Sequence, residues 1–430
     1  SAKDGAEELA ERIEDSTDDL VALACFADFI VKTAEMNKAQ NGAKLVIEER
    51  ASPLGTVAVL DGPMIRLVPG LSLAWQEDQP KQRAIVVDAD SASAIHHLAD
   101  PKQAEVFDYT TSALPYHLLD KPKTLIIGAG GGGDVLLARY HGCPSITALE
   151  LDPAIARLMR GSQAEFAQHL YDQPGVNLVV AEARGYLART KEKFDLIQLP
   201  LVESFGAAAA GVTSLNEGYL YTVEAFRAYL DHLTPNGILC VTRWLKNPLT
   251  DSDFIRIVST LTEAMKLYGD FYLGQHVIAI RGMFTATVLV SGRPFSVGQI
   301  KVTRGFCSKA CFDLVWHHEI YLDTPNGAQS GEPLGVNEFN KLPQPYHYEA
   351  AAKLLYGGRD DFIRSYPFDI SPTTVDRPYH SLTQRWRGIR HLRATLGDQW
   401  VRYADWGYIV LWATLAQALV LSALLILLPL

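Results

Sequence analysis

The chain has 430 residues, of which 48% are hydrophobic and 20% are charged, and its formal net charge is −10. This length indicates two or three structural units, and the composition excludes a chain that is disordered throughout. The negative charge argues against a general nucleic-acid-binding protein, because contact with the phosphate backbone requires clustered cations.

The N-terminal part of the chain is predicted to contain a helical segment and a small antiparallel sheet. Residues 1–43 are acidic and include an apolar stretch, which favours helix. Residues 44–118 contain short apolar runs separated by turn residues such as Asp61-Gly62-Pro63, a pattern typical of antiparallel strands. We expect strands at 44–48, 56–60 and 84–88 in a small β domain, followed by a linking helix.

Residues 119–292 show short apolar runs that alternate with helical stretches, which indicates a parallel α/β sheet. The expected strands are 124–127, 145–149, 176–180, 194–199 and 237–242. Residues 293–405 are rich in proline, glycine and aromatic residues, so we expect an irregular extension there.

Residues 406–430 contain no charged side chain and are predicted to form a transmembrane helix. As a helix they would be ~37 Å long, enough to cross a bilayer core of ~30 Å. Arginine and tryptophan side chains precede this stretch, and positive charge marks the cytoplasmic side of a membrane. The expected location is therefore the cell inner membrane with the globular part in the cytoplasm. The alternative is a buried C-terminal helix of a soluble protein. The first residue is Ser1 and the last three are Leu-Pro-Leu, which suggests an excerpt of a longer protein.

A glycine-rich segment follows the first strand of the expected parallel sheet. Gly128, Gly130 and Gly133 fit the pattern G-x-G-x-x-G between a strand and a helix, and Asp134 lies at the start of that helix. Glycine is required because the turn is tight and a ligand must approach the backbone closely. Alone, the pattern is only moderately specific, since dinucleotide sites and ordinary glycine turns share it.

Acidic residues lie at the ends of the next two strands. Glu150 comes 22 residues after Gly128, where a carboxylate can accept hydrogen bonds from both ribose hydroxyls. Glu182, followed by Ala183, ends the third strand, where a carboxylate can accept a hydrogen bond from an adenine amino group. The three features in order at successive strand ends predict a Rossmann-like, nucleoside-binding domain.

The segment from Tyr109 to Trp244 resembles spermidine synthases and their membrane-fused bacterial relatives. The matching motifs are Leu125-Ile-Ile-Gly-Ala-Gly-Gly-Gly-Gly-Asp134, Ala148-Leu-Glu-Leu-Asp-Pro153, Glu182-Ala-Arg184, Phe194-Asp-Leu-Ile-Gln198, Leu220-Tyr-Thr-Val-Glu-Ala-Phe226 and Leu233-Thr-Pro-Asn-Gly-Ile-Leu239. The resemblance implies a class I methyltransferase-like fold preceded by a small β domain. It also implies transfer of an aminopropyl group from decarboxylated S-adenosylmethionine to an amine, which leaves methylthioadenosine.

The same resemblance implies roles for particular residues in the donor site. Tyr109 is expected to cover the donor pocket. The residues expected to bind the donor are Gly128, Gly130, Gly133, Asp134, Glu150, Glu182 and Ala183.

The amine half of the site departs from the family pattern, which usually has Asp-x-x-Asp-Pro after the fourth strand. This chain has Pro200-Leu-Val-Glu-Ser204, so Pro200 replaces the principal catalytic aspartate and Glu203 takes the second acidic position. A base is needed because a protonated amine has no lone pair, and we assign that role to Glu203. Glu217 and Asp108 are the alternatives. The glycine segment also lacks the family's central acid, which leaves open whether the donor is decarboxylated.

Three functions remain open at this point. The leading hypothesis is a membrane-tethered aminopropyltransferase that acts on a small amine or a lipid amine, and a homodimer is an option. The alternatives are an S-adenosylmethionine-dependent methyltransferase and a non-catalytic nucleoside-binding regulatory domain of a membrane protein. No metal is expected. Cysteine and histidine residues at 307, 311, 317 and 318 do not have the usual zinc spacing, so we interpret the cysteines as packing residues.

Overall fold

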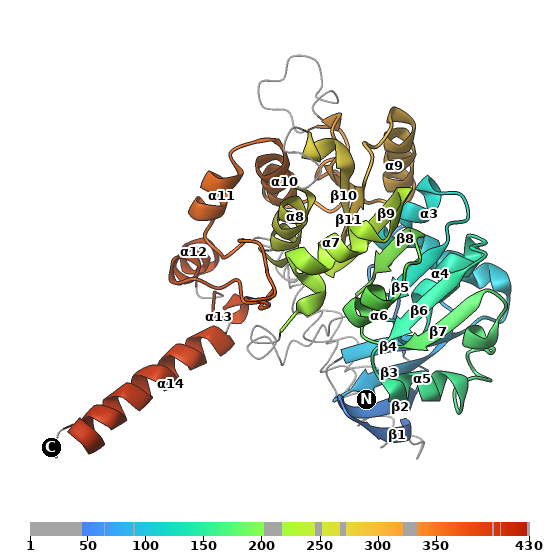
Figure 1. Cartoon of the computed structure of the whole chain (residues 1–430), viewed down its shortest axis with the longest axis horizontal. Helices are drawn as coiled ribbons and strands as arrows, with labels where there is room; N and C mark the ends of the chain where they lie inside the picture. Colours follow the sequence, from blue (N-terminus) through green and yellow to red (C-terminus); the bar gives the residue numbers. More distant parts are fainter. Residues whose placement is uncertain are drawn as a thin grey trace, which may run out of the picture.

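The computed structural model describes residues 45–63, 65–88, 91–201, 217–245, 252–266, 272–320, 333–397, 400–404 and 406–427. These residues form two sheets with helices around them (Figure 1). The helical segment predicted at 1–43 lies outside the described residues.

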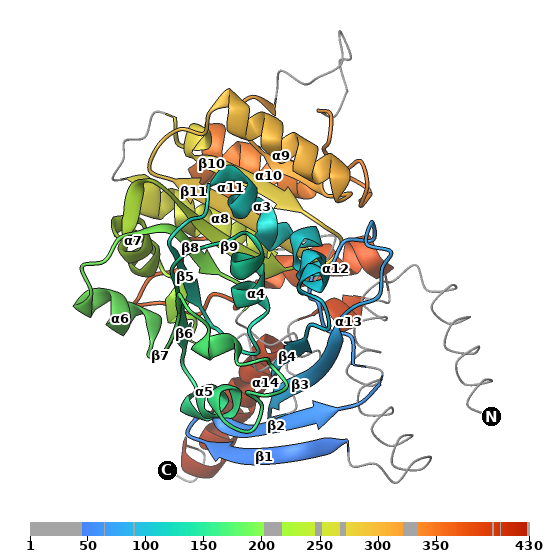
Figure 2. The same ribbon diagram turned by 90° about the vertical axis from the view of Figure 1, so that its right-hand side faces the viewer.

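The smaller sheet is an antiparallel meander with the strand order β1-β2-β3-β4, which confirms the predicted small antiparallel sheet. Its strands are β1 (Val46–Ser52), β2 (Gly55–Asp61), β3 (Lys81–Val87) and β4 (Ser91–His97). Val57, Val59, Ile85 and Ile95 are buried in the same core as the larger sheet. Figure 2 shows the small sheet beneath the larger one, with β4 next to α4 (Gly133–Tyr140).

Three short helical segments connect the two sheets. They are η1 (Pro101–Tyr109), η2 (Thr111–Ala113) and α3 (Leu114–Leu118). Asp100 begins η1 by accepting a hydrogen bond from the backbone N–H of Lys102, and Gln103 completes a capping box. This connection brings η1 against α4.

The larger sheet has eight strands in the order β12-β10-β11-β9-β8-β5-β6-β7. The pairs from β7 to β9 are parallel, and those from β9 through β11 and β10 to β12 are antiparallel. Counted from β5, the parallel part has the order 3-2-1-4-5 of a Rossmann-type sheet, which confirms the predicted class I methyltransferase-like α/β fold. The strands are β5 (Thr124–Ile127), β6 (Ile146–Glu150), β7 (Val176–Val180), β8 (Phe194–Leu199), β9 (Leu233–Trp244), β10 (Val277–Arg281), β11 (Thr285–Ser291) and β12 (Asp313–Trp316).

Helices cover this sheet, several strands of which are mainly apolar and buried over their whole length. Every residue of β5, β10 and β11 is buried, as expected for strands covered on both faces. The helices that follow the parallel strands, besides α4, are α5 (Pro153–Arg160), α6 (Ala183–Arg189), α7 (Val223–Asp231) and α8 (Ser252–Met265). The glycine segment after β5 therefore connects a fully buried strand to α4, at the carboxyl ends of the parallel strands.

The segment from 293 to 405 is not irregular, contrary to the prediction. Its described part contains β12 and the helices α9 (Val297–Lys309), α10 (Tyr346–Tyr356), α11 (Arg359–Ser365), α12 (Trp386–Leu396) and α13 (Trp400–Tyr403). Connections that contain proline and glycine separate these short helices. The prediction was based on these residues, and the helices between them were therefore missed.

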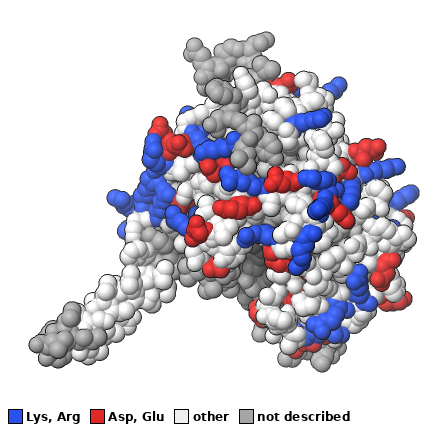
Figure 3. Space-filling view, in the orientation of Figure 1, with Lys and Arg blue, Asp and Glu red and all other residues white. Residues whose placement is uncertain are grey.

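The last described elements are α14 (Trp406–Ser422) and a π-helical turn (Ala423–Leu427). The helix projects away from the body of the molecule (Figure 1), and Figure 3 shows no charged side chain along it. At 17 residues α14 is roughly 25 Å long, short of the ~30 Å hydrocarbon core. In the described part of the chain no helix is long and apolar enough to cross a membrane, so the predicted transmembrane helix is not confirmed.

Candidate functional site

A cavity of about 120 Å³ lies at the carboxyl ends of β5 and β8, where ligands bind in open α/β sheets. Its walls come from the glycine segment, from β4, from the connection through η1 and η2, and from Pro200 after β8. The volume is below the roughly 300–1,000 Å³ typical of small-molecule sites. The cavity is therefore small for a complete small-molecule site.

The glycine segment is shaped by a close approach of β4 as well as by its own turn. Gly130 and Gly132 have φ values of 48° and 94°, in the left-handed region that favours glycine. A Cβ atom on Gly131 would lie 2.1 Å from the backbone oxygen of Ala94 in β4. The Gly131 N–H donates a 2.8 Å hydrogen bond to Oγ of Ser93. Glycine at 131 is thus required by the small sheet.

Asp134 lies in the first turn of α4. It lines the cavity together with Gly128 and Gly133. Its carboxylate accepts a 2.8 Å hydrogen bond from Nε2 of Gln198, and Oε1 of Gln198 in turn accepts one from the Tyr116 hydroxyl. Because Tyr116 donates to the amide oxygen, the amide nitrogen of Gln198 faces Asp134. Burial raises the pKa of Asp134 to about 6. A carboxylate with that pKa is suited to accept a proton near neutral pH.

Glu150 ends β6 as predicted, but its carboxylate is already engaged by the backbone. One oxygen accepts a 2.8 Å hydrogen bond from the Gly130 N–H and the other accepts one of the same length from the Asp152 N–H. Burial raises the pKa of Glu150, while these backbone hydrogen bonds oppose the shift. Glu150 therefore links the glycine segment to the end of β6. Gly130 is bonded to Glu150 and does not line the cavity.

Glu182 is the N-cap residue of α6, which begins at Ala183. Its carboxylate accepts hydrogen bonds of 2.9 Å from the Arg184 N–H and 2.6 Å from the Gly185 N–H. These bonds satisfy two backbone donors that a helix end leaves without partners. Ala183 is buried.

Among the described residues, none of the other candidates for a catalytic role lines the cavity. The Tyr109 ring packs against Trp75, with a centroid separation of 5.1 Å, and the ammonium of Lys309 lies 4.8 Å from its centroid. Glu203 lies outside the described residues, whereas Pro200 forms part of the cavity wall. Of the alternatives, Glu217 is exposed, and Asp108 bonds to His117 and His141 away from the cavity.

The sequence interpretation missed the contribution of β4 to this site. His96 is 4% exposed and lines the cavity, and in the described part of the chain its Nδ1 has no hydrogen-bond partner. Burial lowers the pKa of His96 to about 3, so the imidazole is neutral. The available signal was weak, because β4 reads Ser-Ala-Ser-Ala-Ile-His-His and contains one β-branched residue.

Comparisons with known proteins fit this geometry. Residues 110–288 match the family described as Spermine/spermidine synthase domain. The polyamine aminopropyltransferase of Sulfolobus acidocaldarius is 26% identical over 43% of this chain and 57% of its own length. That of Pectobacterium atrosepticum is 30% identical over 24% of this chain and 39% of its own length. The chain thus spans about half the length, or less, of these relatives.

Among solved structures, spermidine synthase from Thermotoga maritima is similar, with a TM-score of 0.40 and 16% identity. That comparison covers 72% of this chain and 84% of the other.

Proposed function

We propose that this chain, whose residues 110–288 carry a spermidine synthase domain, transfers an aminopropyl group from decarboxylated S-adenosylmethionine to an amine. The observation that carries the proposal is the cavity that places Gly128, Gly133 and Asp134 together at the carboxyl ends of the parallel strands. In this reaction the nitrogen lone pair of the amine attacks the aminopropyl carbon bonded to sulfur. The carbon–sulfur bond breaks, sulfur keeps the electron pair, and methylthioadenosine leaves.

The donor half of the site is supported by the positions of Glu150 and Glu182. Each backbone hydrogen bond to these carboxylates occupies only one lone-pair site of the oxygen that accepts it. Glu150 is therefore able to hold the glycine segment and to accept a ribose hydroxyl together. Glu182 occupies the equivalent place at the end of β7, where we assign it to the adenine amino group.

The acceptor half needs a carboxylate that removes a proton from the attacking amine. Pro200 has no acidic group, and Glu203 remains our assignment by position in the sequence. Within the described residues, Asp134 also meets the requirement, since it lines the cavity and its pKa is about 6. Comparison of Glu203→Gln with Asp134→Asn separates the two roles.

Two other functions are candidates. The absence of the family's central acid from the glycine segment favours a methyltransferase, and Pro200 in the cavity wall favours a non-catalytic nucleoside-binding domain. Product analysis distinguishes these functions. The purified chain is incubated with a panel of di- and polyamines and with each sulfonium donor, and the nucleoside product is identified by mass spectrometry. Methylthioadenosine supports aminopropyl transfer, whereas S-adenosylhomocysteine contradicts it in favour of methyl transfer. Donor binding without either product supports the regulatory function.

We also propose that α14 attaches the chain to the inner membrane from the cytoplasmic side. Its support is a row of exposed apolar side chains, with Val410, Leu411, Leu415 and Leu419 between 47% and 63% exposed. Basic side chains of α12 precede the helix and suit an anionic membrane surface. Attachment there would favour a lipid amine or a membrane-associated amine as the acceptor, and a homodimer remains compatible with it.

A further inference from the structure

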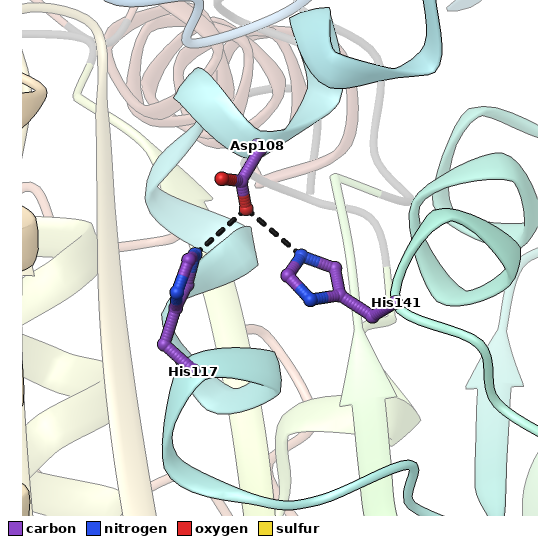
Figure 4. Close-up of side chains that lie close together, drawn as sticks. All are labelled: Asp108, His117 and His141. Carbon is purple, nitrogen blue, oxygen red and sulfur yellow. Dashed lines mark hydrogen bonds and ion pairs between the residues drawn. The ribbon is translucent and has the colours of Figure 1, made fainter. Parts of the chain in front are cut away.

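Three potential metal ligands, Asp108, His117 and His141, lie close together (Figure 4). They meet at the C-terminal end of α4, opposite the end that begins at Gly133. Asp108 belongs to η1, His117 to α3, and His141 is the C-cap residue of α4. Oδ1 of Asp108 lies 2.7 Å from Nε2 of His117 and 2.8 Å from Nε2 of His141. Within the described residues this is the one group of at least three His, Cys, Asp or Glu whose ligand atoms all lie within 4.8 Å of one another.

The cluster is preorganised by its surroundings. Asp108 is 6% exposed, whereas the side chains of His141 and His117 are 16% and 28% exposed. The ring of Tyr116 stacks on His141 at a centroid separation of 5.2 Å, and Phe306 lies 4.9 Å from His117.

We propose that Asp108, His117 and His141 bind a divalent transition-metal ion of the zinc class. Two imidazole nitrogens and one carboxylate oxygen suit such an ion, and three protein ligands leave a coordination position for solvent on the partly exposed His117 side. At metal–ligand distances of about 2.0–2.2 Å the ligand atoms would stand roughly 3.3 Å apart in a tetrahedron. Each imidazole nitrogen would move away from Asp108 by about half an ångström, and the ion would take the place of the two N–H hydrogens.

One neighbouring cation competes with a metal ion for Asp108. Nζ of Lys309 lies 4.0 Å from Oδ2 of Asp108, and the lysine side chain is 54% exposed. The ammonium is therefore free to swing into solvent when an ion binds. Because like charges repel in this partly buried place, removal of the lysine charge should tighten metal binding.

The ion would connect η1 to α4, and both elements also contribute to the wall of the cavity. Asp108 shares η1 with Phe107, which lines the cavity, and His141 ends the helix that begins at Gly133 and Asp134. A bond from η1 through the metal to α4 would hold these two walls at a fixed separation. We therefore assign the ion a positioning and stabilising role, with no contact to the reacting atoms.

The decisive measurement is metal binding by the full chain after treatment with a chelator and its removal. Cobalt(II) is titrated first, because the intensity of its visible absorption reports a four- or five-coordinate site with nitrogen ligands. Zinc is then added to displace it, and calorimetry gives the stoichiometry and Kd. We expect one ion per chain and a zinc-dependent rise in the midpoint of thermal unfolding, since the ligand set exists only in the folded state.

Variants identify the ligands. His141→Gln and His117→Gln should each raise the zinc Kd by more than the roughly 10–100-fold that the loss of a residue supporting a metal ligand usually costs. His169→Gln is the matched control, because His169 also lies near two carboxylates, Glu165 at 3.5 Å and Asp172 at 3.7 Å, but its side chain is 57% exposed. Its zinc Kd should not change. Lys309→Met should lower the zinc Kd, and it leaves all three ligands in place even if the histidine variants fail to fold.

Two outcomes would overturn the proposal. One is a native chain that binds no cobalt or zinc with a defined stoichiometry, which would leave a hydrogen-bonded Asp–His–His network without an ion. The other is binding that His169→Gln weakens as much as the cluster variants do, or that Lys309→Met leaves unchanged. The cobalt spectrum and zinc affinity do not depend on transferase activity, so this test is independent of the proposed function.

Discussion

Ser93 of the small sheet accepts a 2.8 Å hydrogen bond from the backbone N–H of Gly131, which joins β4 directly to the glycine segment. The segment that would face a nucleoside in a simple Rossmann-like domain therefore packs on the protein's own second sheet. The two sheets build the cavity together, and neither forms it alone.

Two glycine variants should separate packing from ligand binding. Gly131→Ala places a Cβ 2.1 Å from the Ala94 oxygen, so we expect it to reduce the free energy of unfolding by about 1–3 kcal/mol. In Gly133→Ala the new Cβ would lie 3.6 Å from the Phe107 ring and 3.9 Å from Nε2 of His96, both ordinary contacts, but it adds a methyl group to the cavity wall. It should unfold like the wild type and bind the donor more weakly. Urea unfolding and calorimetry check both, and equal stability of the two variants would contradict the packing role of Gly131.

Glu150 should matter more for donor affinity than Glu182. If Glu150 binds the ribose as proposed, Glu150→Ala removes hydrogen bonds from ribose hydroxyls, each worth ~1.5–3 kcal/mol, and it also frees the Gly130 N–H. We expect the donor Kd to rise at least tenfold in calorimetry. Glu182→Ala should cost about 1 kcal/mol of stability through the lost helix cap, in addition to its effect on affinity. An unchanged Kd in Glu150→Ala would refute the ribose assignment.

The parallel strands were predictable because they are short and mainly apolar, and β5, β6 and β8 are almost wholly buried. The strands expected at 124–127, 176–180 and 194–199 have the bounds of β5, β7 and β8. The sequence did not predict β4, whose small and polar residues lack a strand pattern, and so Ser93 and His96 were missing from the expected site.

The cluster of Asp108, His117 and His141 could not be predicted from the sequence, for a different reason. Its members are spread over 34 residues, and no repeat or metal motif relates them. They meet only because η1 and α3 pack on the C-terminal end of α4. Asp108 appeared in the sequence as an alternative base, and its bonds to two histidines give it another role.

Removal of α14 should abolish membrane binding without unfolding the rest of the chain. A chain that ends before Trp406 loses mainly side chains that are exposed, so little buried apolar area is lost. We expect the full chain to float with vesicles that contain anionic lipid, and the shortened chain to stay in the aqueous fraction. Both should unfold cooperatively at a similar temperature. Aggregation of the shortened chain would identify α14 as a packing element of the fold instead.

The ionisation of Asp134 should be visible in protein stability. Burial raises its pKa in the folded state from 3.8 to about 6, so the folded protein binds its proton more tightly than the unfolded chain does. This group therefore contributes stability below about pH 4, and the contribution is lost as pH rises through 6. Asp134→Asn cannot ionise, so its stability relative to wild type should increase between pH 5 and pH 8. A constant difference across that range would show that Asp134 ionises normally.

The same residue provides the last test, which concerns the base. If Asp134 takes the proton of the amine, wild-type turnover should fall as pH drops through about 6, because protonation then removes the base. Asp134→Asn should keep donor binding and lower turnover by ~10²–10⁴-fold. Its pH–rate profile should no longer fall through pH 6, but the dependence that comes from ionisation of the amine should remain. Glu203→Gln is the paired variant. If it alone loses turnover, the base is Glu203 and the raised pKa of Asp134 reflects burial only. If both variants keep wild-type turnover, neither carboxylate serves, and product analysis should then show methyl transfer or donor binding without reaction.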